Sequence, residues 1–204
     1  MTLIYTGLNV NQRINQVVKK EIEQATQIIA NGGVILYPTD TVWGIGCSAL
    51  SEDAIGKIYK IKQRSESKSM IVLVDSIERL INYVEDLPDI AIDLIQKAEK
   101  PLTIIYPKAK NLPNNLVASD GSIAIRVVNH PFCMKLIAEM NAPLVSTSAN
   151  ISGEPTPMYY EDISPEVKNQ MDFIVDQRFE TSKNAQPSTI IRLIDQENVE
   201  VIRL

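Results

Sequence analysis

Five basic side chains and one acidic side chain lie within residues 57–68, which leaves this segment with a formal charge of +4. The basic residues are Lys57, Lys60, Lys62, Arg64 and Lys68. Lys62 and Arg64 stand two residues apart at the end of a predicted helix, where both can reach one anion if the helix stops there. An arginine fork and a compact lysine charge together suit a polyphosphate. The alternative is a solvated helix face, on which cations are favourable near the C-terminus.

Two segments rich in hydroxyl groups each follow an apolar strand pattern. Tyr37–Gly44 reads Tyr-Pro-Thr-Asp-Thr-Val-Trp-Gly, and Ser146–Gly153 reads Ser-Thr-Ser-Ala-Asn-Ile-Ser-Gly. In open α/β sheets, ligands bind beyond the carboxyl ends of strands, and clustered hydroxyl, amide and backbone donors suit phosphate or carboxylate oxygens. Ordinary surface turns have a similar composition, so each segment alone is consistent with either reading.

A single charged residue, Arg126, interrupts the apolar strand pattern over Ile123–Val127. A buried cation needs either a partner or a cleft, so Arg126 is a candidate ligand for an anion, with a structural ion pair as the alternative. His130 precedes a proline and is expected at the surface, where the strand exits. Cys47 and Cys133 are expected in the core. Without a nucleophile paired with a base, covalent catalysis is disfavoured.

Helical and strand patterns alternate along the chain and must position these groups. Helices are predicted over 14–29, 53–62, 76–84, 88–98 and 131–140. Strands are predicted over 34–37, 70–74, 102–106, 123–127, 143–146, 172–176, 189–194 and 199–203. This alternation predicts an α/β fold with a mixed sheet.

The composition excludes several function classes. The chain has 204 residues, 45% of them hydrophobic, which fits one globular domain over 1–204. Its net charge of −5 argues against a broadly basic nucleic-acid binder. One histidine, two cysteines and no CxxC predict neither a protein metal site nor a disulfide framework. Neither a P-loop nor a GxGxxG motif is present. No signal peptide or long apolar run is found, so the cytoplasm is expected and a membrane is not.

These features occur as an ordered set that resembles the YrdC family of threonylcarbamoyl-AMP synthases. The matching motifs are Tyr37–Gly44, Lys62-Gln63-Arg64, the arginine strand Ile123–Val127 before His130-Pro131, Ser146–Gly153 and the late Pro187–Ile190. The resemblance covers nearly the whole chain, which corresponds to the domain that members of the family share. It implies a twisted open mixed sheet with flanking helices and a concave, positively charged cavity.

The resemblance also implies an activity, the synthesis of threonylcarbamoyl-AMP from L-threonine, bicarbonate or CO2, and ATP, with release of pyrophosphate. The product feeds threonylcarbamoylation of certain tRNAs by downstream transferase proteins. The implied nucleotide-binding residues are Lys62, Arg64, Lys68, Ser122, Ser148, Asn150, Thr156 and Arg203. The implied L-threonine-binding residues are Thr41, Arg126, Ser146 and Ser188. Lys62 and Arg64 are expected to be catalytic by neutralising the leaving pyrophosphate, and Mg²⁺ is expected to arrive with the nucleotide.

Two other functions remain open on the sequence. One is a binding protein of the same fold, whose basic segment contacts tRNA or double-stranded RNA without catalysis. The other is carbamoyl transfer, as in the YrdC-like domain of hydrogenase-maturation enzymes. Those enzymes are much longer and carry zinc-type cysteine motifs, which this sequence lacks.

Overall fold

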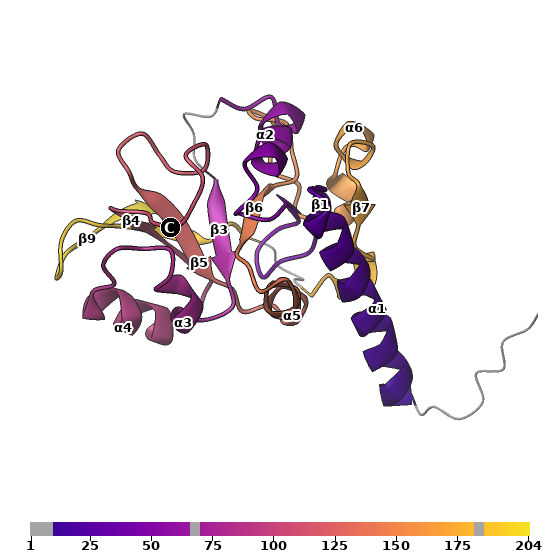
Figure 1. The fold of residues 1–204 in the computed structure, drawn as a ribbon, viewed down its shortest axis with the longest axis horizontal. Coiled ribbons are helices and arrows are strands. Elements are labelled where there is room, and N and C mark those ends of the chain that lie inside the picture. Colours follow the sequence, from indigo (N-terminus) through magenta and orange to yellow (C-terminus); the bar gives the residue numbers. More distant parts are fainter. Residues whose placement is uncertain (1–9, 66–69, 182–185) are drawn as a thin grey trace, which may run out of the picture.

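A nine-stranded mixed sheet forms the centre of the computed structural model, which describes residues 10–65, 70–181 and 186–204, with side chains from residue 15 onward (Figure 1). Its strands are β1 (Ile35–Tyr37), β2 (Gly44–Gly46), β3 (Ile71–Val74), β4 (Leu102–Tyr106), β5 (Ile123–Val127), β6 (Leu144–Ser148), β7 (Phe173–Ile174), β8 (Thr189–Leu193) and β9 (Val199–Arg203). Their order across the sheet is β7-β1-β2-β6-β3-β5-β4-β8-β9. The pairs β1–β7, β3–β5 and β4–β8 are parallel, and the other five pairs are antiparallel. The predicted α/β fold with a mixed sheet is therefore confirmed.

Helices flank this sheet. They are α1 (Val10–Ala30), α2 (Glu52–Ile61), α3 (Ile77–Leu80), α4 (Asp89–Lys97), α5 (Pro131–Met140) and α6 (Pro165–Lys168), with 3₁₀ turns η1 (Tyr160–Asp162) and η2 (Gln177–Phe179). Figure 1 shows α5 nearly end-on beside β3, and α1 projecting away from the body of the molecule. Within the described residues, no helix has the length and hydropathy needed to cross a membrane.

Both faces of the sheet are packed at β1 and β3. Leu36 of β1 and Val72 of β3 belong to a core that includes α2. Their neighbours Tyr37 and Leu73 belong to a second core, which α1 and α5 complete on the opposite face. This alternation explains why both strands read as continuous apolar runs. Among the described residues, those of β4, β8 and β9 contribute nothing to the second core, so part of that face carries no helix.

The structure shows one strand that the sequence pattern did not reveal. β2 is three residues long and contains two glycines, so it carries little of the side-chain pattern that identifies a strand. It lies between β1 and β6, pairing Ile35 with Gly46 and Ile45 with Thr147. β2 thereby joins the two hydroxyl-rich segments side by side.

Gly46 is required because the ring of Tyr37 lies across its backbone. The Tyr37 hydroxyl donates a hydrogen bond of 3.1 Å to the carbonyl of Val145. A Cβ added at Gly46 would lie 2.3 Å from that carbonyl oxygen and 2.6 Å from Cε1 of Tyr37. Neither the Val145 carbonyl nor the buried Tyr37 ring can move aside without a cost in packing free energy.

We therefore expect Gly46→Ala to lower the free energy of unfolding by about 1–3 kcal/mol, measured by urea denaturation. The matched control is Gly56→Ala, because Gly56 lies within α2 and an added Cβ there meets nothing within 4 Å. The control should raise the free energy of unfolding by about 0.5–1 kcal/mol, the usual gain for alanine over glycine in a helix. Equal effects of the two substitutions would contradict the steric argument.

Candidate functional site

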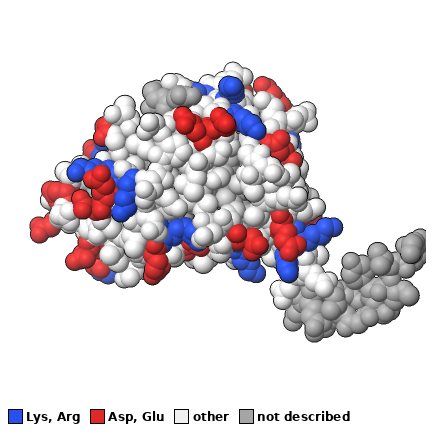
Figure 2. All heavy atoms as spheres, in the orientation of Figure 1, with Lys and Arg blue, Asp and Glu red and all other residues white. Residues whose placement is uncertain are grey.

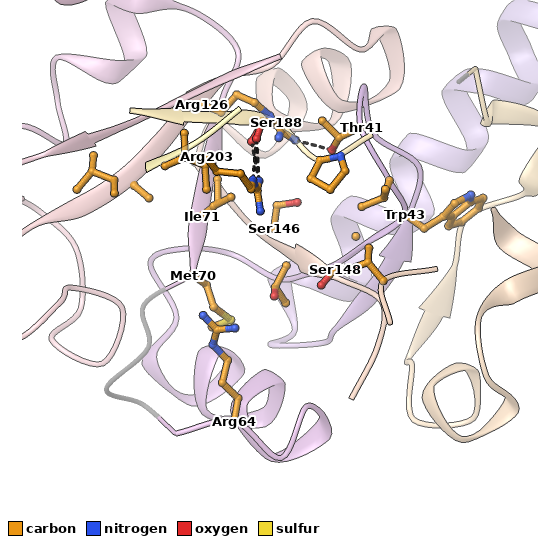
Figure 3. A pocket seen from close by; sticks show the side chains of 18 residues that line it. Thr41, Trp43, Arg64, Met70, Ile71, Arg126, Ser146, Ser148, Ser188 and Arg203 are labelled. Carbon is orange, nitrogen blue, oxygen red and sulfur yellow. Dashed lines mark hydrogen bonds between the residues drawn. The ribbon is translucent and has the colours of Figure 1, made fainter. Parts of the chain in front are cut away.

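A cavity of about 320 Å³ opens on the part of the sheet that no helix covers (Figure 3). Its floor is the apolar side chains Ile71, Ile105, Ala124 and Ile190 from four neighbouring strands. Its polar lining is Thr41, Arg64, Arg126, Ser146, Thr147, Ser148, Thr156, Ser188 and Arg203. The two hydroxyl-rich segments therefore reach one cavity from adjacent strands, as expected for a site at strand ends.

Three arginines line the cavity, and its lining within the described residues includes no acidic side chain. Figure 3 shows Arg126 with Thr41 and Ser188 at one end of the cavity and Arg64 at the other, with Ser146 and Ser148 between them. Burial lowers the pKa of the Arg64 guanidinium. Arginine side chains at both ends of a cavity are groups that suit an anionic ligand.

Arg126 is held by one carboxylate, and one of its donors is unpaired among the described residues. It is 3% exposed, and its Nη2 lies 3.1 Å from Asp40 Oδ1 and donates to Thr41 Oγ1 at 3.3 Å. Asp40 also accepts a bond of 3.3 Å from the backbone amide of Asn129, which fixes the carboxylate. The Nε of Arg126 has no hydrogen-bond partner within the described part of the chain. Arg126 therefore has the structural ion pair that one alternative predicted, and its side chain also lines the cavity.

Arg203 reaches the same end of the cavity from the edge strand β9. Its Nε and Nη2 donate bonds of 3.0 and 2.8 Å to the carbonyl of Ser188. The hydroxyl of Ser188 lies 2.8 Å from that of Thr103. Burial and, second, the nearby Arg126 lower the pKa of Arg203. An anion bound between these two arginines would relieve their repulsion.

Lys62 and Arg64 point to different places although they are two residues apart. α2 ends at Ile61, and Gln63 then adopts a left-handed conformation with φ of 49°. The amide of Arg64 donates to the carbonyl of Tyr59, and that of Gln63 to Lys60, which is a Schellman ending. The chain thus reverses after Lys62. Arg64 lines the cavity, whereas Lys62 lies in the interior.

The ammonium group of Lys62 binds the loop that follows β6. Its Nζ donates to the carbonyls of Ser148 and Asn150, the latter at 2.7 Å. Burial and, to a lesser extent, the charge of Arg64 lower the pKa of Lys62 to about 8. Lys62 is 1% exposed and does not belong to the cavity lining.

The remaining predicted nucleotide residues lie in three kinds of position. Ser148 and Thr156 line the cavity. Asn150 lies outside the lining, and its side chain donates to the carbonyls of Ile151 and Glu154. Ser122 is 7% exposed, and its amide donates to Asp120, also outside the lining. Lys68 lies outside the described residues.

The structure corrects the expected position of His130. It is 1% exposed, so the prediction of a surface position is wrong. The ring of Phe179 in η2 packs 5.3 Å from that of Phe132 and helps to cover the segment after β5. Burial lowers the pKa of His130, an effect that Asp40 partly opposes. Cys47 and Cys133 are buried as predicted.

The sequence reasoning missed the apolar floor and the partner of Arg126. A usable signal existed for Ala124, because residues two apart on a strand share a face and Arg126 was already a candidate. Asp40 was noted as a carboxylate, but nothing in its spacing from Arg126 predicted their contact, since the two are 86 positions apart.

Comparison with known proteins agrees with this architecture. The Sua5/YciO/YrdC family model, described as "Telomere recombination", matches residues 27–204. A threonylcarbamoyl-AMP synthase of Pseudoalteromonas translucida is 38% identical over 172 residues, covering 83% of this chain and 91% of the relative. A putative threonylcarbamoyl-AMP synthase of Methanocaldococcus jannaschii is 36% identical over 186 residues, covering 90% of this chain and 85% of the relative.

Two solved structures share the fold. P. abyssi Sua5 complexed with L-threonine has a TM-score of 0.79 and 29% identity, covering 86% of this chain. This chain spans only 52% of that Sua5 chain. E. coli YciO has a TM-score of 0.78 and 27% identity, covering 91% of this chain and 89% of its own. From its family match and its curated relatives, this chain belongs to the Sua5/YciO/YrdC family.

Proposed function

We propose that this protein is an L-threonylcarbamoyladenylate synthase, which joins L-threonine, bicarbonate or CO2, and ATP and releases pyrophosphate. The observation that carries the proposal is Arg126, a buried cation beside Thr41 whose Nε has no partner among the described residues, in a cavity lined by three arginines. The relatives named threonylcarbamoyl-AMP synthase and the Sua5 structure with L-threonine support the same assignment. The product would be consumed by downstream tRNA threonylcarbamoyl transferase proteins.

The L-threonine subsite lies at the Arg126 end of the cavity in this proposal. A planar guanidinium is well suited to a carboxylate, and the Nε of Arg126 has no partner among the described residues. Thr41, Ser146 and Ser188 line the same cavity and supply hydroxyl groups for the remaining polar atoms of the amino acid. The Asp40–Arg126 contact keeps the guanidinium in place while the substrate binds.

The nucleotide subsite in this proposal extends from Arg64 past Ser148 and Thr156 to Arg203, which lies at the Arg126 end of the cavity. Arg64 provides the charge at the end of the cavity opposite Arg126, and Ser148 lies between them (Figure 3). The distance between the two ends suits a triphosphate chain, because its α-phosphorus must lie next to the L-threonine subsite. Mg²⁺ would enter as part of the ATP substrate.

The chemistry needs positioning and charge stabilisation. The amino group of threonine attacks CO2, forming an N–C bond and losing a proton, which gives a carbamate. A carbamate oxygen then attacks the α-phosphorus of ATP, and the bond to the β-phosphate oxygen breaks to release pyrophosphate. The arginines would stabilise the charge that develops on the leaving group, and the cavity would hold the reactants together.

The first test mixes the protein with Mg-ATP and bicarbonate and measures pyrophosphate with and without L-threonine. We expect release that depends on threonine. No release with any amino acid, combined with a salt-dependent affinity for tRNA or double-stranded RNA, would instead support the RNA-binding alternative. The face in Figure 2 carries Lys and Arg interspersed with Asp and Glu around a broad uncharged area, which does not favour that alternative.

The second test is Arg126→Lys, which keeps a positive charge beside Asp40 but removes the guanidinium fork. We expect the KM for L-threonine to rise about 10- to 100-fold, because a hydrogen bond to a charged group contributes about 1.5–3 kcal/mol. The control is Arg79→Lys, since Arg79 pairs with Asp75 through a 2.6 Å contact outside the cavity lining. An unchanged KM in Arg126→Lys would remove Arg126 from the threonine subsite.

The third test is Arg64→Met, which preserves much of the side-chain bulk and removes the charge. We expect the KM for ATP to rise at least about 10-fold while the KM for threonine changes little. Lys60→Met is the matched control, because Lys60 is an exposed cation at the end of the same helix. If both variants raised the KM for ATP equally, the effect would come from the loss of any positive charge and not from Arg64 in particular.

A further inference from the structure

Lys62 makes three hydrogen bonds to the end of β6 and the loop after it, and the bonds fall on alternate residues of 148–152. Its ammonium donates to the carbonyls of Ser148 and Asn150. Its own carbonyl accepts a bond of 2.9 Å from the amide of Ser152. The side chain and main chain of one residue therefore bind every second residue of 148–152.

The carbonyls that Lys62 satisfies are part of a buried turn. Ala149 and Ile151 are 1% and 8% exposed, and Ser148 and Asn150, whose carbonyls Lys62 binds, are partly buried. A buried carbonyl without a donor is costly, and a lysine ammonium supplies up to three N–H groups at one point. The side chain of Asn150 closes the far side of the same turn by donating to the carbonyl of Glu154 at 2.7 Å.

This contact connects two parts of the cavity wall. Lys62 follows directly on α2, whose residues Ile55 and Ile58 are fully buried in the core. Arg64 lines the cavity two residues later, and Ser148 lines it from the last position of β6, where the loop that Lys62 holds begins. The pairing of Ser148 with Gly44 of β2 fixes one side of this residue, and the bond from Lys62 connects it to the segment that carries Arg64.

We propose that Lys62 is a positioning residue, which fixes the 148–154 loop against the end of α2 and acts on the nucleotide through Arg64 and Ser148 without binding phosphate itself. The proposal rests on the proposed function for the identity of the nucleotide. It assigns different tasks to the two cations of the Lys-Gln-Arg motif. Arg64 contacts the ligand, and Lys62 contacts the protein.

The first experiment is hydrogen exchange on the free protein, with no substrate present. In Lys62→Met we expect the amides of Ser152 and Glu154 to exchange at least about 10-fold faster than in the wild type, because the loop loses its anchor. Arg64→Met and Lys60→Met should leave these amides unchanged. Lys62→Gln serves as a second variant, since its amide keeps two N–H donors on a side chain one bond shorter, and should give intermediate protection.

The second experiment compares steady-state kinetics and direct binding of ATP in the same variants. We expect Lys62→Met to lower kcat by about 100-fold, the typical cost of misplacing a reacting group by about 1 Å, with a much smaller change in ATP affinity. Arg64→Met should instead weaken ATP binding directly, which Lys62→Met should leave nearly unchanged.

Two outcomes would overturn the proposal. If Lys62→Met kept full loop protection and lost ATP affinity as Arg64→Met does, Lys62 would be a direct phosphate ligand. If neither loop protection nor kcat changed, Lys62 would be dispensable to the site. Failure of the synthase assignment is distinguishable, because the wild type would then release no pyrophosphate with threonine while the exchange experiment still reports on the loop.

Discussion

The burial of Arg126 constrains the rest of this site. A guanidinium in the middle of a strand, 3% exposed, has lost nearly all of its water and requires compensation. Asp40 supplies one charge at 3.1 Å, and Thr41 supplies one acceptor. That compensation is incomplete, because Nε of Arg126 is still without a partner in the described part of the chain. A buried cation that is only partly paired is stable enough to fold and still attracts an anion.

The sheet makes this arrangement feasible by leaving part of one face without a helix. α1 and α5 pack on that face against β1 and β3, so the uncovered strands β4, β5 and β8 form a floor beside them. β2 matters equally, because its glycines let the ring of Tyr37 lie flat between β1 and β6. The segments carrying Thr41 and Ser146 are therefore adjacent in space although they are far apart in sequence.

Much of this fold could be predicted from the sequence, because long periodic segments have strong signals. The strands at Leu102–Tyr106 and Ile123–Val127 and the helix at Pro131–Met140 have the predicted bounds. β2 could not be predicted, since two glycines in three residues give no alternation of side chains. The burial of His130 was also missed, because it depends on a distant segment around Phe179 that packs over it.

The site shows the same division between local and long-range information. Residue types were enough to select Arg64 and Arg126, and the family resemblance added Ser148 and Arg203; all four line the cavity. The direction of the Arg64 side chain depends on one local backbone feature, the left-handed conformation of Gln63. No composition rule predicts that conformation for a residue other than glycine.

The basic segment illustrates why charge along the sequence is a weak guide to charge in space. Lys57 donates a 2.8 Å bond to the carbonyl of Gly32 at the end of α1, and Lys60 is exposed. Lys62 turns into the interior, and Arg64 turns into the cavity. A nucleic-acid duplex is held by cations that share one surface, so these four described cations do not form such a surface. The four described cations of this segment are instead divided among the end of α1, solvent, the loop after β6 and the cavity, and of the four only Arg64 lines the cavity.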